Sequence, residues 1–420
     1  MSTRSASWSR PAERTARALV TACALGVFAT SWAVLHTGPY SGYQIRDTPV
    51  YQAYGQNVVG GAVPYRDFAL EYPPGALPTF VLPAVGSPSA HAYRLRFDLL
   101  MLVCGLAALL GMAATLGALG ADTLRLGCAL GFAAAAPVAL GTVVLTRYDL
   151  WPAALAAAAL AALCAGRDRL SLAALGVAAA AKVYPAVLAP LAVAHVWRRR
   201  GPREAALATG IGAAAAAAIY APFVTLSPGG VWDSVVRQAT RPLQIESLGS
   251  AVLLASHHLF GLGLHVETSH GSQNLVGRLP DAVGAAETAV LLAGLAAMWL
   301  WFARRPRDTE TLVRTAAAAV CVCVAFGKVL SPQFMLWLVP LVPLVRGRRG
   351  VAAATLLGAA LILTQLWFPD RYWDLVFTHG RYETALVLAR DVLLLMLVAA
   401  LVLPLSSVTR DGDRGGDRSR

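Results

Sequence analysis

Apolar segments long enough to cross a bilayer recur from one end of this 420-residue chain to the other, and 57% of its residues are hydrophobic against 14% charged. A helix needs about 20 apolar residues to span the hydrocarbon layer. Backbone amides in lipid must be hydrogen-bonded within the protein, which restricts the chain to helices or a closed barrel. Runs such as residues 210–224 lack the alternation of barrel strands. We therefore expect an all-α polytopic membrane protein.

The apolar runs predict a bundle of about 12 transmembrane helices within one transmembrane domain, residues 1–405. Their expected positions are 16–36, 97–118, 124–145, 150–166, 170–182, 184–197, 204–225, 282–303, 311–329, 332–346, 350–368 and 384–405. Residues 406–420 are rich in Gly, Asp and Arg, a composition typical of a disordered tail.

Positive charge is placed in short connections between apolar runs. The net charge is +12, and basic clusters occupy residues 198–203, 304–307 and 346–349. The positive-inside rule puts such loops in the cytoplasm, so we expect no nucleic-acid partner, a plasma-membrane location and cytoplasmic termini. The Arg-rich, Lys-poor composition suggests a bacterial source. The longer segments 37–96, 226–281 and 369–383 then become outer loops.

The cysteines indicate neither a disulfide framework nor a metal site. All six lie inside apolar runs, where a thiol behaves as a small buried hydrophobe. The predicted transmembrane domain, residues 1–405, has neither a Gly-rich phosphate loop nor a metal-binding Asp-x-Asp. We expect no metal and no cofactor.

The first outer loop concentrates polar chemistry in residues 46–80. Thr48-Pro49 is a good helix start, and a short surface helix over residues 49–59 would place Asp47 and Tyr51 near one face. Pro73-Pro74 then precedes an apolar stretch, residues 75–85, which is too short to span and can dip into the membrane. Carboxylates there are candidate general bases: Asp47, Asp67 and Glu71. The alternative is that Asp47 caps the helix while the other two solvate a loop.

The chain has only two lysines, and both lie at the outer tips of similar short hairpins. Lys182 and Lys328 each precede a proline closely and sit at membrane depth, where an ammonium is costly unless paired. The phosphate of a lipid substrate could pair them. The alternative is that both side chains snorkel to the interface.

Further candidates come from the outer ends of other segments. Arg94 can bind a head group or act as an interfacial anchor. One of His257 and His258 can stabilise a phosphate if the second outer loop folds over the site. Gln333 faces the tip of its hairpin, as does Trp337 one turn later. The predicted substrate-binding residues are Tyr51, Glu71, Tyr72, Arg94, Lys182, His257, His258, Lys328 and Gln333.

Three dispersed motifs resemble glycosyltransferase family 87, also known by the domain label DUF2029. They are "DTPVYQAYGQNVVGGAVPYRDFALEYPPGALPTFVLP", "AKVYPAVLAPL" and "VLSPQFMLWLVPL". The resemblance implies a C-type glycosyltransferase fold and a polyprenyl-phosphate sugar donor, with mannose as the expected hexose. It also implies a catalytic acid in the first outer loop, and Asp47 matches that position. Glu71 departs from the family pattern, which leaves its role open.

The expected function is therefore transfer of a hexose from a polyprenyl-phosphate donor to a lipid or cell-envelope glycan acceptor on the outer face. The developing charge on the leaving phosphate calls for cations, and one base implies inversion. The alternative is a transporter or lipid flippase, which the paired Lys/Pro hairpins favour. A transporter, however, has no need for two long polar outer loops.

Overall fold

Long apolar helices form most of the molecule. The computed structural model describes residues 9–42, 44–304 and 308–403, so the tail predicted at 406–420 lies outside the described residues. Seven helices in these ranges are long and apolar enough to cross a membrane. They are α1 (Ser9–Val34), α4 (Ala90–Ala118), α5 (Thr123–Leu140), α10 (Pro202–Leu226), α13 (Arg278–Ala303), α16 (Gly347–Trp367) and α18 (Arg381–Val402). The predicted helical, multi-pass architecture is confirmed.

Shorter apolar helices complete the bundle: α7 (Leu150–Cys164), α8 (Asp168–Ala181), α9 (Ala189–Arg200) and α14 (Thr309–Ala325). The alanine-rich sequences of α7 and α8 allow close packing. Gly176 of α8 faces Gly212 of α10 so closely that a Cβ on either residue would overlap the backbone of the other helix. Helices packed through small residues in this way are typical of membrane bundles.

Two predicted helices are broken, and the count of 12 is not confirmed. Residues 332–346 form only short turns, η4 (Pro332–Phe334), α15 (Met335–Leu338) and η5 (Val342–Leu344). Pro332, Pro340 and Pro343 remove backbone donors from this stretch, which explains why no continuous helix forms. The expected helix 184–197 likewise begins as a 3-10 turn, η3 (Tyr184–Leu188), before α9.

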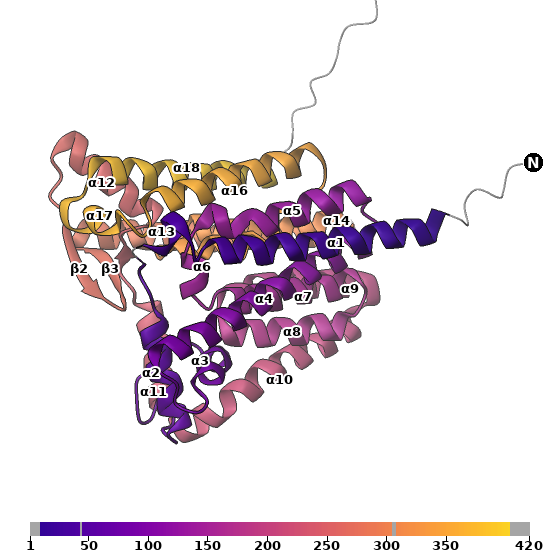
Figure 1. Cartoon of the computed structure of the whole chain (residues 1–420), viewed down its shortest axis with the longest axis horizontal. Helices are drawn as coiled ribbons and strands as arrows, with labels where there is room; N and C mark the ends of the chain where they lie inside the picture. The colour runs from indigo at the N-terminus through magenta and orange to yellow at the C-terminus, as the bar shows by residue number, and fades with distance from the viewer. Residues whose placement is uncertain (1–8, 43, 305–307, 404–420) are drawn as a thin grey trace, which may run out of the picture.

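The predicted outer loops carry their own structure. The first contains η1 (Gly38–Ser41), the expected short helix α2 (Thr48–Val59), η2 (Pro74–Ala76) and α3 (Leu77–Ala84). The second contains α11 (Pro228–Ala239), β1 (Leu243–Gln244), α12 (Leu248–Phe260), β2 (His265–Ser269) and β3 (Ser272–Val276). The third contains α17 (Tyr372–Thr378). Figure 1 shows α2, α11, α12, α17, β2 and β3 gathered at one end of the bundle.

A small antiparallel sheet in the second loop was not expected from the sequence. Its strand order is β1-β3-β2, with Leu243 and Val266 both paired to Leu275. His270 and Gly271 have φ values of 55° and 69°, and they form the tight turn between β2 and β3. The Gln244 N–H also donates to the Lys328 carbonyl at 2.9 Å, which ties the sheet to the bundle.

The basic turns lie at the opposite end. Arg125 at the start of α5 pairs with Glu310 at the start of α14 at 2.6 Å, and it also donates to the Leu344 carbonyl. The turns before α8 and α10 are joined by ion pairs of Asp168 with Arg199 and Arg200. The chain therefore separates a polar, loop-rich end from a strongly basic one.

Candidate functional site

A buried turn between α6 (Val143–Thr146) and α7 carries two opposite charges. Arg147 and Asp149 are the only charged residues between Arg125 and Arg167. The side chain of Arg147 is 7% exposed and that of Asp149 is 1% exposed. Buried ions are tolerated only with partners, and each of these two has one from another segment.

Asp47 is the partner of Arg147. Its Oδ1 lies 2.8 Å from Arg147 Nη1, and its Oδ2 accepts a hydrogen bond from the Tyr51 hydroxyl at 3.3 Å. Asp47 stands at the N-cap position of α2, yet its side chain makes no capping hydrogen bond. Because the carboxylate is 31% exposed, it is oriented by two fixed partners and still reachable from outside.

Lys182 at the end of α8 is the partner of Asp149. Its Nζ lies 2.6 Å from Asp149 Oδ1, which also accepts from Trp337 Nε1 at 2.7 Å. The ammonium is enclosed by the rings of Tyr148 and Phe334, 4.7 and 5.3 Å from their centroids. Lys182 was predicted to pair with a lipid phosphate, but the structure gives it a resident carboxylate.

Aromatic rings form a packed support beneath Asp47. Tyr51 is buried and stacks on Phe80 with centroids 4.5 Å apart, while Tyr148 lies edge-on to both rings. Tyr72 contacts Tyr51 and Tyr148 at 5.7 and 5.2 Å. The predicted residue Tyr51 therefore positions Asp47 from the core, whereas Tyr72 is partly exposed above it.

Glu71 lies between the first and second loops. Its backbone carbonyl accepts from Gln238 of α11 at 3.0 Å, and its carboxylate borders Gly271 at the hairpin tip. Burial raises the pKa of the Glu71 carboxyl; Arg241 and Arg237 oppose this rise. The Asp47 charge also acts on Glu71, so the two carboxylates share one electrostatic neighbourhood.

A second group of cations surrounds the hairpin tip. Burial lowers the pKa of His270, and the nearby positive charges of Arg237, Arg241 and Lys328 lower it further. Lys328 donates to the Ala239 carbonyl at 3.1 Å, and Arg241 donates to Ser272 at 3.0 Å. No ion pair within 4.0 Å engages these four side chains in the part of the chain that the structure describes. Arg237, Arg241 and Lys328 are therefore cations whose charge remains available, whereas the lowered pKa of His270 favours its neutral ring.

A buried corner anchors the second loop to the bundle. Glu246, in the turn between β1 and α12, accepts from Gln244 Nε2 at 2.7 Å, and the same nitrogen donates to Ser331 at 2.8 Å. Arg390 of α18 donates to the Glu246 carbonyl at 2.6 Å. Burial raises the pKa of the Glu246 carboxyl to about 8. This corner holds β1 against the segment that carries Lys328.

Arg94 lies beside another cation. Arg94 stands near the start of α4, close to Arg46, the residue before Asp47. Burial lowers the pKa of Arg46, and the positive charge of Arg94 lowers it further. Within the part of the chain that the structure describes, the Arg46 side chain donates to Gln44 at 2.9 Å. Two like charges at one edge of the site favour an anion between them.

The predicted histidines lie elsewhere. His257 Nδ1 is 2.6 Å from the Leu262 carbonyl, and His258 contacts Thr384 of α18 at 3.4 Å. The ring of His257 packs against that of His379. Among the described residues, neither His257 nor His258 contacts Asp47, Arg147 or Lys182.

Gln333 lies in η4, beside Phe334. Both faces of Trp337 are covered, by Tyr184 at 4.1 Å and Phe334 at 3.9 Å, so this ring is not free to stack on a sugar.

Sequence reasoning missed Arg147, Asp149, Arg241 and His270. A signal existed for the first two, since they interrupt an otherwise uncharged stretch of about 40 residues at its outer turn. His270 stands in a Ser-His-Gly-Ser turn between two short polar-apolar segments, a hairpin pattern. Nothing local marks Arg241.

These features define a class: a multi-pass membrane protein with a reachable carboxylate and many cations at one end. Within the described ranges, no group of three or more His, Cys, Asp or Glu side chains could hold a metal ion. The chain matches the model of glycosyltransferase family 87 over residues 70–332 and belongs to that family. The match includes Arg147, Asp149, Lys182 and Lys328 and begins after Asp47.

Comparison with solved structures finds ArnT from Cupriavidus metallidurans in two states. The form bound to undecaprenyl phosphate has a TM-score of 0.48 at 16% identity. The apo form has a TM-score of 0.46 at 14% identity. Each match covers 91% of this chain and 76% of ArnT. No curated protein shows significant sequence similarity to the chain.

Proposed function

We propose that the chain transfers a hexose, with mannose as the expected sugar, from a polyprenyl-phosphate donor to a lipid or cell-envelope glycan acceptor. The reaction takes place on the outer face of the plasma membrane, and Asp47 is its general base. Membership of glycosyltransferase family 87 supports the reaction class. The observation that carries the role of Asp47 is its orientation by Arg147 and Tyr51 while it stays open to the outside.

The chemistry needs one base and an anion site. The acceptor hydroxyl attacks the anomeric carbon and gives its proton to Asp47, while the bond from that carbon to the phosphate oxygen breaks. The leaving lipid phosphate keeps the electron pair and gains charge, which cations stabilise. With a single base opposite the leaving group, the sugar inverts.

The cations around the hairpin tip fit the leaving phosphate better than Lys182 does. Lys182 is already neutralised by Asp149, and Arg147 by Asp47. Arg237, Arg241 and Lys328 have no such close partner among the described residues, and all three act on His270 at the hairpin tip, which borders Glu71. We assign the donor phosphate to this group. Lys182 and Arg147 hold the two aspartates in place.

The acceptor then approaches from the side of Arg46 and Arg94. Arg46 directly precedes Asp47 in the sequence, and the charge of Arg94 acts on it. These two like charges suit an acceptor with an anionic head group. This placement puts the acceptor hydroxyl near Asp47 and leaves the second loop for the donor.

The test is transfer from a purified polyprenyl-phosphate sugar by Asp47→Asn in detergent. A positioned general base contributes about 10²–10⁴-fold to a rate, so we expect a loss of at least about 10²-fold. Asp67→Asn is the matched control, because Asp67 lies in the same loop and pairs with Arg66 at the surface at 2.9 Å. The hydrogen bond from Arg66 lowers the pKa of Asp67 to about 2, so this surface carboxylate stays ionised. The control should keep its activity.

Reconstituted liposomes separate transfer from transport. A transferase changes the covalent structure of the labelled lipid and gives a glycosylated acceptor. Passage of an unmodified substrate across the bilayer, with Asp47→Asn equally active, would replace the proposal by a transporter or flippase.

A further inference from the structure

The basic end of the bundle contains a built cluster around two neighbouring turns. The turns at residues 166–169 and 197–204 carry six arginines and only two acids, Asp168 and Glu204. Helix α8 runs 14 residues from Asp168 to Ala181, which at about 1.5 Å per residue separates this cluster from Lys182 by about 21 Å. The cluster therefore lies near the membrane face opposite Asp47.

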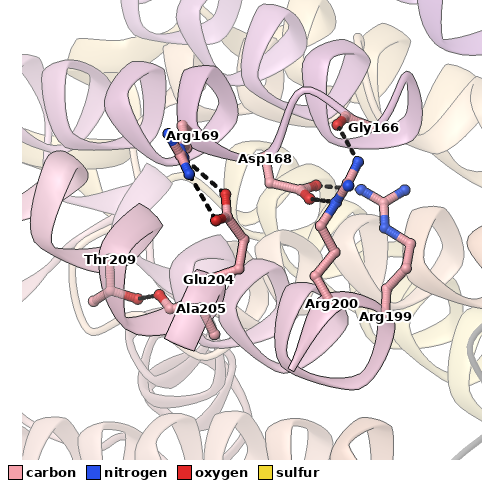
Figure 2. Close-up of polar contacts among 8 residues, drawn as sticks. All are labelled: Gly166, Asp168, Arg169, Arg199, Arg200, Glu204, Ala205 and Thr209. Carbon is pink, nitrogen blue, oxygen red and sulfur yellow. Dashed lines mark hydrogen bonds and ion pairs between the residues drawn. The ribbon is translucent and has the colours of Figure 1, made fainter. Parts of the chain in front are cut away.

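Both acids are fully used inside the cluster. The Asp168 side chain is buried and accepts from Arg199 through Oδ1 and from Arg200 through Oδ2, the latter at 2.7 Å. Glu204 forms a bidentate pair with Arg169, with both N–O distances 2.8 Å. Figure 2 shows these pairs side by side, joining the start of α8 to the end of α9 and the start of α10. The pairs make a rigid frame.

Positive charge is left over on this frame. The guanidinium groups of Arg167, Arg198 and Arg203 make no hydrogen bond or ion pair within the described residues. Arg200 donates through Nε to Asp168 and through Nη2 to the Gly166 carbonyl. Arg169 donates through both Nε and Nη2 to the Glu204 carboxylate. Each of these two keeps further N–H donors. A surface pocket of about 400 Å³ is lined by the two paired acids, Asp168 and Glu204, together with Gly166, Arg167, Arg169, Leu170 and Arg200.

Apolar side chains beside the pocket place it at head-group level. Leu170 lines the pocket and is 55% exposed, and Trp197, in the same last turn of α9 as Arg200, is 56% exposed. Tryptophan is enriched where the bilayer meets water, because its ring is amphipathic. A ligand in this pocket would thus have its charge among arginines and its apolar part along lipid-exposed helices.

We propose that this pocket binds the phosphate head group of an anionic phospholipid from the leaflet opposite the Asp47 site. A phosphodiester accepts paired hydrogen bonds from guanidinium groups, and Arg167 and Arg200 supply them from two different turns. The bound lipid bridges the α7–α8 and α9–α10 turns. The proposal does not depend on the transfer reaction.

The experiment titrates the purified full-length protein in dodecyl maltoside with dioctanoyl-phosphatidylglycerol and counts bound lipid by native mass spectrometry. Dioctanoyl-phosphatidylcholine is the neutral comparison. We expect preferential binding of phosphatidylglycerol and a loss of at least about tenfold in Arg167→Gln/Arg200→Gln. The frame survives in this variant, because Asp168 keeps Arg199 and Glu204 keeps Arg169. Arg167→Gln alone, which breaks no side-chain contact, should already weaken binding by about threefold or more.

Arg346→Gln/Arg348→Gln is the matched control. It removes the same charge from two exposed arginines in another basic turn of the same end, and it should leave lipid binding unchanged. An equal loss of lipid binding in both double variants would show that binding depends on general surface charge, and would overturn the proposed site. Equal binding of the two lipids would also overturn it. Displacement of the lipid by millimolar inorganic phosphate would assign the pocket to a free phosphate ion instead.

Discussion

Asp149 shows why a charged residue at a site need not touch a substrate. It is buried, and one of its oxygens receives both Lys182 and Trp337. Removing one member of a buried ion pair leaves the other uncompensated, which costs far more than removing both. The pair therefore anchors the turn at residues 147–149, which also carries Arg147, the partner of Asp47.

A double-mutant cycle tests this role. Asp149→Asn and Lys182→Met should each destabilise the protein by about 3–5 kcal/mol. The double variant should cost clearly less than the sum, since no unpaired charge remains. Thermal unfolding in detergent measures all four proteins. Additive losses would mean that Lys182 has no structural bond to Asp149 and is free for a ligand, as the sequence first suggested.

Glu246 gives the molecule a pH-dependent stability. Its carboxyl has a pKa of about 8 in the folded protein and an ordinary value of 4.5. The folded state thus keeps a proton that the unfolded state releases. The contribution of Glu246 to the free energy of unfolding is therefore fully present below about pH 4.5 and decreases as the pH rises toward 8.

Thermal unfolding of the wild type and Glu246→Gln at several pH values checks the effect. Relative to the variant, the free energy of unfolding of the wild type should decrease by up to about 2 kcal/mol between pH 6 and pH 8. Above that range the difference between the two proteins should stay constant. The variant keeps an oxygen for Gln244, so the corner should still form. Parallel profiles for the two proteins would show that Glu246 does not titrate in this range.

At the scale of elements, α10 positions the second loop. It touches α8 through Gly212, where a Cβ would lie 2.6 Å from the Leu172 carbonyl oxygen. Helix α11 follows α10 directly and donates from Ser234 and Gln238 to the carbonyls of Leu70 and Glu71. A shift of α10 should therefore reach the loop that carries Glu71.

Gly212→Ala should push α10 away from α8, with a cost of about 1–3 kcal/mol and reduced transfer activity. Gly210→Ala is the control on the same helix, because nothing lies within 4 Å of a Cβ there. That substitution should be neutral or slightly stabilising, since Ala favours helix more than Gly. Equal effects of the two variants on stability and activity would show that the contact with α8 is not the cause.

The elements also show what the sequence could reveal. The span-length helices and the short helix after Asp47 follow from local apolar runs and proline positions, while the dip of residues 75–85 into the membrane stays a prediction. The partners of Asp47 and Asp149 could not be predicted, because residues 47, 147, 149, 182 and 337 meet only in the folded bundle. The sheet was missed because its strands are at most five residues long. The turns at residues 332–346 were missed because the apolar composition of this stretch was given more weight than its three prolines.

At the scale of the whole molecule, charge is sorted between two ends. The basic turns at residues 166–169, 197–204 and 346–349 lie at the end where Arg125 and Asp168 form their ion pairs. Helix α2, which follows Asp47, and strands β2 and β3 lie at the other end (Figure 1). The positive-inside rule then orients the protein. We propose that the Asp47 end is extracytoplasmic and that both termini are cytoplasmic.

Cysteine labelling in intact cells tests this orientation. His91 at the start of α4 and Arg203 at the start of α10 are both exposed, and they lie at opposite ends. With the lipid-facing Cys23 and Cys128 replaced by Ser, His91→Cys should react with a membrane-impermeant maleimide in intact cells. Arg203→Cys should react only after permeabilisation. The reverse pattern would place Asp47 in the cytoplasm, where a lipid-linked donor on the outer leaflet could not reach it.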